Sequence, residues 1–180
     1  MNERILVDDA HELLRREGLH YAVFPSEYLH IRYYTLLLVK NSRLASDERL
    51  LLEQQVSELV KNAVKHGNKC DPSRNVRIWY SFTDREARLI VQDEGSGFAD
   101  IEKWNIFNEK RQEYVERQDF TALMNYASWR TSASDKYDGG NAMFAALEYW
   151  NEGVVYSSAR NTVAVGKKFA FDIMESGDDE

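Results

Sequence analysis

The sequence predicts a two-layer α+β sandwich, in which helices cover one face of a mixed, mostly antiparallel sheet. Two observations support this prediction: a long helical pattern is followed by a strand hairpin, and a shorter helical pattern is followed by a second hairpin. Each of these elements has an apolar side, and stacking helices on a sheet buries those sides against one another. The 180 residues suffice for one well-buried core and are too few for two.

The first half of the chain predicts three helices and one strand. Residues 3–17 are expected to form a short amphipathic helix, because their apolar residues fall on related faces. Residues 19–24 alternate loosely as a strand does, and Pro25 separates them from a helix over 28–39. A helix over 46–67 has acidic residues in its first turn, apolar residues at helical spacing and a glycine at its end.

The second half predicts two hairpins, one helix and a long connection. The hairpin strands are expected over 76–82 with 87–92, and over 153–158 with 162–171. A helix over 142–150 precedes the second hairpin. The connection over 98–138 has no strong period, and a segment of that length in a compact domain is usually a functional lid or has helices of its own.

These expectations divide the chain into three parts. An N-terminal helical extension covers 1–18, and a single domain covers 19–174, with its lid at about 98–140. The acidic residues 175–180 are expected to form a disordered tail.

Composition excludes several classes of protein. The net charge of −7 argues against a nucleic-acid partner, since phosphate backbones bind basic surfaces. The one cysteine, Cys70, has no partner for an internal disulfide and fits a reducing compartment. The charged N-terminus has no signal-peptide core, and no apolar run approaches membrane-spanning length. We therefore expect a cytoplasmic protein that is not in a membrane.

The helix over 46–67 contains a first group of chemically capable residues. Glu58 and Asn62 are four residues apart, so they face the same way one turn apart. An amide oxygen is a hard ligand suited to Mg²⁺, and a neighbouring carboxylate can orient or deprotonate a hydroxyl that attacks a phosphate. Lys65 and His66 lie on the next turn, where they could reach phosphate charge. Alone, such a pair is most often a solvated helix face.

Two glycine-containing segments form further groups. Asp93 ends a strand, where its carboxylate could accept a hydrogen bond from the exocyclic amine of adenine. Gly95 and Gly97 follow it and allow the chain to approach a flat base closely. Gly139-Gly140-Asn141 precedes a helix N-terminus, whose N–H groups could bind phosphate. Each segment by itself also fits an ordinary turn.

The order and spacing of these groups resemble the GHKL (histidine kinase-like) ATPase superfamily, whose domain is called the Bergerat fold. VSELVKNAVKHGN is similar to the E-x-x-x-N box of that family, and VQDEGSGF is similar to its D-x-G-x-G box. GGNAMFAALEYWNEGVVYSSARNTVAV resembles the second glycine box and the strands after it. The likeness covers roughly residues 19 to 171, and it is greatest to the short anti-sigma factor serine/threonine kinases of bacterial partner switching.

The resemblance implies ATP and Mg²⁺ as cofactors and assigns a role to each group. Asn62 would bind Mg²⁺, and Glu58 would be the general base. Asp93 would bind the adenine amine, with Thr162 supporting it. Arg32 would lie at a partner surface. The other residues expected at the nucleotide are Lys65, His66, Gly95, Gly97, Gly139, Gly140, Asn141 and Ala142.

Two features depart from the family pattern. Ala142 stands where the lid motif prefers glycine, although alanine keeps the backbone N–H groups. The segment over 98–138 is longer than in the short serine kinases. Both features bear on catalysis more than on nucleotide binding.

The resemblance implies an anti-sigma regulatory factor that sequesters a sigma factor and phosphorylates a STAS-type antagonist, with a homodimer through the first strand and helix. One alternative is a nucleotide-binding regulatory module without phosphotransfer. Another is the ATP-binding domain of a histidine kinase, for which the N-terminal part offers His11, His20 and His30. None of these histidines stands in a recognisable coiled-coil hairpin.

Overall fold

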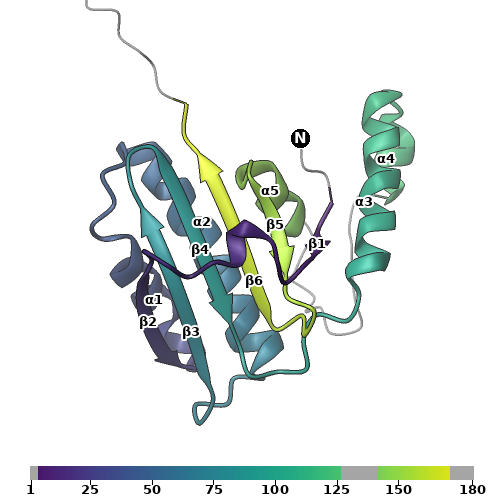
Figure 1. Cartoon of the computed structure of the whole chain (residues 1–180). Helices are drawn as coiled ribbons and strands as arrows, with labels where there is room; N and C mark the ends of the chain where they lie inside the picture. Colours follow the sequence, from purple (N-terminus) through teal and green to yellow (C-terminus); the bar gives the residue numbers. More distant parts are fainter. Residues whose placement is uncertain (1–3, 127–141, 171–180) are drawn as a thin grey trace, which may run out of the picture.

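The computed structural model describes residues 4–126 and 142–170. They form a six-stranded sheet with the order β1-β5-β6-β4-β3-β2 (Figure 1). β1 runs parallel to β5, and every other neighbouring pair is antiparallel. The strands are β1 (Leu6–Val7), β2 (His20–Pro25), β3 (Asn75–Phe82), β4 (Glu86–Gln92), β5 (Gly153–Tyr156) and β6 (Thr162–Lys168).

The main helices lie together on one face of this sheet (Figure 1). This face is covered by a 3-10 turn, η2 (Tyr28–His30), and by α1 (Ile31–Val39), α2 (Ser46–Asn62) and α5 (Ala142–Tyr149). The predicted α+β sandwich with a mixed, mostly antiparallel sheet is therefore confirmed. No helix within residues 4–126 and 142–170 combines the length and the apolar character needed to cross a membrane.

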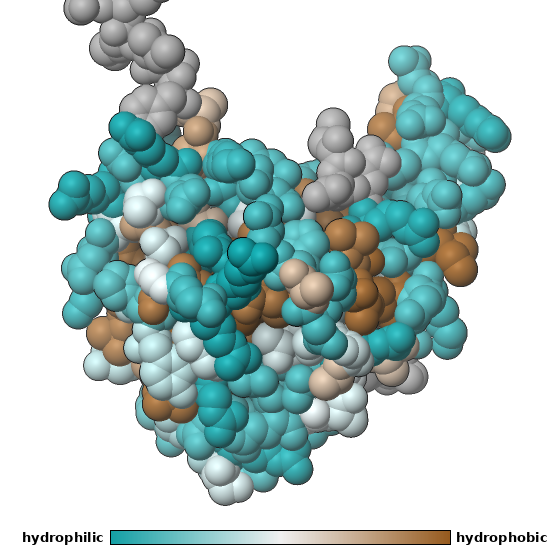
Figure 2. All heavy atoms as spheres, in the orientation of Figure 1, coloured by the Kyte–Doolittle hydropathy of each residue, from teal (hydrophilic) through white to brown (hydrophobic). Residues whose placement is uncertain are grey.

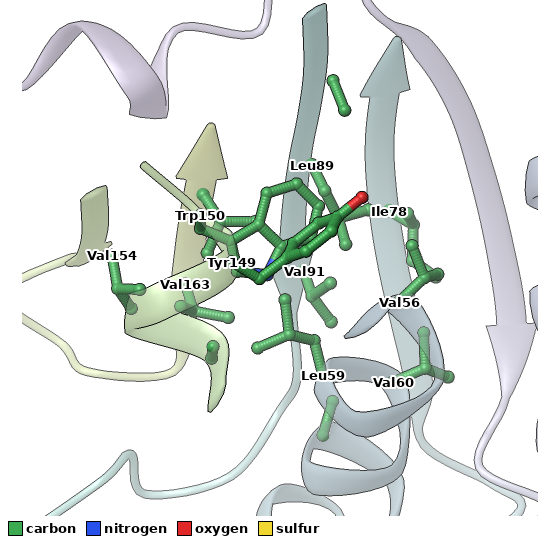
Figure 3. Packing of buried hydrophobic residues seen from close by; sticks show 14 of the residues in the cluster. Val56, Leu59, Val60, Ile78, Leu89, Val91, Tyr149, Trp150, Val154 and Val163 are labelled. Atoms are coloured by element: carbon green, nitrogen blue, oxygen red, sulfur yellow. The ribbon is translucent and has the colours of Figure 1, made fainter. Parts of the chain in front are cut away.

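The core lies between α2, α5 and the sheet (Figure 3). The apolar stripe that the helical spacing predicts is buried in α2 and in the turn that follows it: Leu52, Val56, Leu59, Val60, Ala63 and Val64. On the sheet, alternate residues of β3 and β4 point to this side, since successive side chains of a strand face opposite ways. Ile78, Leu89 and Val91 of these strands and Trp150 after α5 are buried in the same cluster. α2 is thus fixed against β4, the strand that leads to Asp93.

The helix expected over residues 3–17 is wrong. Residues 4–17 contain the short strand β1 and a single 3-10 turn, η1 (Glu12–Leu14). Leu13 is buried against Ile90 on the sheet face opposite the helices. The Arg88 guanidinium donates to the carbonyls of Glu12, Leu13 and Arg15 at 3.1, 3.3 and 2.9 Å. The apolar residues of this segment therefore belong to two different contacts rather than to one face of a helix.

The long connection contains two helices, α3 (Ile101–Glu116) and α4 (Phe120–Tyr126). They form a hairpin that projects beyond the β1 edge of the sheet (Figure 1). The side chain of Asn105 in α3 pairs with both backbone groups of Ile5, at 2.9 Å each. Hydrophobic atoms are visible between the sheet and this hairpin (Figure 2). The connection thus has helices of its own, anchored at their base to the N-terminal segment.

Candidate nucleotide-binding site

Glu58 and Asn62 lie on the last two turns of α2, with partly exposed side chains. The ammonium of Lys61 lies 3.1 Å from Oε1 and 3.4 Å from Oε2 of Glu58. The Lys61 ammonium therefore occupies part of the Glu58 carboxylate, which keeps further lone pairs that can accept hydrogen bonds. The predicted juxtaposition of a carboxylate and an amide on one helix face is present, together with a lysine that the sequence reading did not assign.

α2 ends in a π-helical turn, Ala63–Gly67. The N–H of Asn68 donates to Ala63 O at 2.8 Å, which closes this wider turn. Single π turns inside or at the end of α-helices occur often at functional sites, because they displace side chains from the regular helical register. Lys65 and His66 lie within this turn, both partly exposed. The π turn therefore connects the Glu58–Asn62 face directly to Gly67.

Asp93 follows the last residue of β4 and is held by backbone contacts. Its N–H donates to Asn161 O at 2.9 Å, and its Oδ1 accepts from the N–H of Gly95 at 2.7 Å. Burial raises the pKa of this carboxyl above its ordinary value, against the lowering effects of the Gly95 hydrogen bond and the Lys69 charge. The Gly95 hydrogen bond goes to Oδ1, and Oδ2 is the oxygen that we predict to accept from a ligand.

Two glycines, Gly67 and Gly95, allow the π turn and the turn after β4 to come together, and Gly97 brings the same turn against the loop between β5 and β6. A Cβ on Gly67 would lie 2.3 Å from Cγ of Asp93, and a Cβ on Gly95 would lie 2.4 Å from Gly67 O. Gly97 has a φ of +87°, and a Cβ there would lie 2.4 Å from Ala159 O. Real side chains never approach that closely, so these positions require glycine. The end of α2 thus touches the carboxylate that is predicted to bind adenine.

Replacing Gly67 by alanine is expected to displace the Asp93 carboxylate and to weaken ATP binding by about tenfold or more, the value of a lost hydrogen bond to a charged group. Isothermal titration with ATP measures the effect. Cys70→Ala, an exposed position after the same turn, is the matched control and should bind like the wild type. Unchanged affinity in Gly67→Ala would show that Asp93 does not need this position.

The surroundings of Asp93 are largely buried. Thr162 is 3% exposed and pairs in register with Gln92, the residue before Asp93. Its hydroxyl donates to Asn161 Oδ1 at 3.4 Å. Burial, and then the charge of Asp93, raise the pKa of the Tyr156 hydroxyl. Thr162 therefore lies beside the strand end that carries Asp93, and its supporting role stays a prediction.

The structure brings together most, but not all, of the predicted site residues. Glu58, Asn62, Lys65 and His66 share the end of α2, and Asp93 with Gly95 contacts Gly67 on the same segment. Arg32 lies exposed on α1, a helix that carries none of the other predicted residues.

Part of the predicted lid lies outside the described residues. Gly139, Gly140 and Asn141 belong to that part, and Ala142 begins α5 without a described side chain. The sequence analysis assigned no role to Asn68, although this residue is the last one of the quoted VSELVKNAVKHGN segment. Its signal was an amide next to a glycine that ends a helix.

The fold and this arrangement agree with a comparison against known families. The family described as "Histidine kinase-like ATPase domain" matches residues 28–120, more than half of the chain. The chain belongs to this family.

Curated relatives narrow the likeness further. The anti-sigma F factor of Geobacillus stearothermophilus is 35% identical over 83 residues, which is 45% of this chain and 57% of that protein. The anti-sigma F factor of Shouchella clausii (strain KSM-K16) is 46% identical over 48 residues, 27% of this chain and 33% of that protein. The chain thus spans between a third and just over half of the length of these relatives.

Proposed function

We propose that this chain is an ATP-binding anti-sigma regulatory factor that phosphorylates a serine or threonine of an antagonist protein of the STAS type. The observation that supports this most is the Glu58–Asn62 pair, kept one turn apart on a helix whose next turn touches Asp93. A binding scaffold has no need of a carboxylate at that place, whereas phosphotransfer does.

Each residue has a role in this proposal. Asp93 Oδ2 accepts a hydrogen bond from the adenine amine, which fixes the base at the end of β4. Glu58 orients the attacking hydroxyl and takes its proton while the new O–P bond forms and the bond to ADP breaks. Lys65 and His66 are proposed near the phosphates, and Gly139, Gly140, Asn141 and Ala142 are proposed to cover them. Thr162 supports Asp93 from β6.

Asn62 is the proposed ligand of Mg²⁺. Among residues 4–126 and 142–170, no three His, Cys, Asp or Glu side chains form a group that could hold a metal ion by themselves. This fits an ion that takes one or two protein oxygens and completes its shell with phosphates and water. Bound Mg²⁺ would neutralise charge that develops on the transferred phosphoryl group.

The protein partners are proposed from the relatives and from one surface. The curated relatives are named anti-sigma F factors, which suggests a sigma factor as a partner here. Arg32 lies on α1 beside exposed apolar side chains, Leu29, Tyr33 and Leu36. Such a mixed basic and apolar surface suits a protein partner or a second copy of the chain. We place the protein in the cytoplasm. It would regulate transcription by binding a sigma factor, without binding nucleic acid itself.

The kinase proposal is tested by incubating the protein with γ-labelled ATP, Mg²⁺ and a STAS-type antagonist from the same genome. Label is expected on a serine or threonine of the antagonist, and alanine at that residue should remove it. ATP binding without any label transfer would overturn the kinase activity and leave the nucleotide site standing.

A second candidate is an ATP-binding regulatory module without phosphotransfer. The ion pair between Lys61 and Glu58 favours it, because the ammonium at 3.1 Å occupies a carboxylate oxygen that would have to accept from the attacking hydroxyl. Partner binding that depends on ATP and is unchanged when Glu58 is replaced would support this candidate over the kinase.

A further inference from the structure

Asn68 is fully buried and joins three separate segments through its side-chain amide. Nδ2 donates to Ser26 Oγ at 2.8 Å and to Asn75 O at 3.0 Å. Oδ1 accepts from the N–H of Glu94 at 2.7 Å. The residue is 0% exposed, and its backbone N–H donates to Ala63 O. Its side chain therefore connects the end of α2 with the residues after β2, with the start of β3 and with the turn that follows Asp93.

The bond to Glu94 acts on the geometry of the site. Glu94 is the residue between Asp93 and Gly95, and the N–H of Gly95 holds one oxygen of Asp93. The Glu94 N–H belongs to the peptide that links Asp93 to Glu94, so the Asn68 bond fixes the backbone between Asp93 and the Gly95 N–H that holds its carboxylate. The same turn is tied from outside by an ion pair between Arg77 and Glu94 at 2.8 Å. The Asn68 side chain is fully buried, whereas the side chains of Arg77 and Glu94 are partly exposed, so water competes less for the Asn68 bond than for this ion pair.

We propose that Asn68 is a positioning residue for adenine recognition, which holds the turn after β4 so that Asp93 Oδ2 faces the base before ATP arrives. This inference rests on the proposed ATP function and adds a residue to it. A preformed acceptor costs less to order on binding than a mobile one, so the cost of losing Asn68 is expected in base recognition. A merely structural residue would lower stability and affect all nucleotides alike.

The test compares ATP with purine riboside triphosphate, which has no 6-amino group, by isothermal titration. The wild type is expected to bind ATP about tenfold to a hundredfold more tightly than the analogue, the value of a hydrogen bond to a charged acceptor. Asn68→Ala is expected to bring this ratio close to one. Ser26→Ala is the matched control, because it removes a bond at the far end of the same amide and leaves the bond to Glu94.

The possible results distinguish the role of Asn68 from the proposed binding of ATP by Asp93. A ratio that falls in Asn68→Ala but not in Ser26→Ala supports the inference. A ratio unchanged in Asn68→Ala, or lowered equally in both variants, overturns it while ATP recognition by Asp93 stands. A wild type that does not distinguish the two nucleotides overturns both.

Hydrogen exchange in the wild type decides the matter even where Asn68→Ala does not fold. Without nucleotide, the amide of Glu94 is expected to exchange as slowly as the amides of β4, because it is already bonded. Exchange at the rate of an open turn would show that the turn is not held and would overturn the inference.

Discussion

Replacing Glu58 by glutamine is expected to lower the rate of phosphotransfer by about 100- to 10,000-fold, the usual contribution of a general base. Glutamine has nearly the shape of glutamate but no charge, so it cannot take the proton of the attacking hydroxyl. Glu58 has no part in the proposed contact with adenine, so ATP affinity is expected to stay within about threefold, well below the loss of one charged hydrogen bond. Label transfer under single-turnover conditions measures the rate, and the rise in melting temperature with Mg-ATP measures binding.

A neighbour on the same helix provides the control. Glu53 is also partly exposed on α2, and Glu53→Gln removes an equal charge without touching the pair of Glu58 with Lys61. It should transfer label at the wild-type rate. If Glu58→Gln retained that rate, the proton would be taken by another group, and the proposed role of Glu58 would have to be abandoned.

Much of the fold is visible in the sequence because most elements bury one continuous side. The apolar face of α2 and the inward-facing residues of β3 and β4 pack in a single core, so the helical and strand periods are both visible in the sequence. The segment over 4–17 misled the prediction for the opposite reason. Ile5 is buried in the core on the helical side of the sheet, whereas Leu13 is buried on the other side, so the spacing between them reflects two contacts.

The helix α3 lacks a clear apolar period because its buried face is partly polar. Its buried residues are Ile101, Trp104, Asn105 and Asn108, which lie at the i, i+3, i+4 and i+7 positions of one face. Two of these four are asparagines, and Asn105 pairs with the backbone of Ile5. Because Ile106 is exposed away from this face, the apolar residues alone do not show the helical period.

At the site, the sequence suggests candidate chemical residues more readily than the residues that place them. Glu58, Asn62 and Asp93 stand in the order of the family motifs, and their chemical roles stay predictions. The contact of Gly67 with Asp93 joins residues 26 positions apart, and the bond from Asn68 to the turn spans the same separation. Such contacts depend on how α2 meets β4, which local patterns do not specify.

Asp93→Asn is expected to abolish specific ATP binding and at the same time to stabilise the nucleotide-free protein. Asn Oδ1 would still accept from Gly95, but Nδ2 would then stand where Oδ2 stands and present a donor to the amine of adenine, itself a donor. The loss of affinity should reach about a hundredfold, since a charged hydrogen bond is lost and an unmatched donor remains. Isothermal titration with ATP and with the analogue lacking the amine measures it.

The stability gain has a defined dependence on pH. Burial raises the pKa of Asp93 above its ordinary value of 3.8, so the folded protein keeps this proton to a higher pH than the unfolded chain does. The contribution of Asp93 to the stability of the wild type is therefore fullest below 3.8 and falls as the pH rises through the folded-state pKa. Asparagine does not titrate, so Asp93→Asn should melt above the wild type at neutral pH, with a difference that shrinks as the pH falls towards 3.8.

The exposed Asp84 in the turn between β3 and β4 offers the control, since Asp84→Asn removes an equal charge without burial and should change neither melting temperature nor affinity. A variant at Asp93 that is less stable than the wild type at neutral pH would mean that the carboxylate stabilises the fold itself. The energetic cost of burying it would then no longer point to a ligand. The proposed adenine contact requires that the Asp93 carboxylate lower the stability of the nucleotide-free protein and contribute a hydrogen bond once the nucleotide is bound.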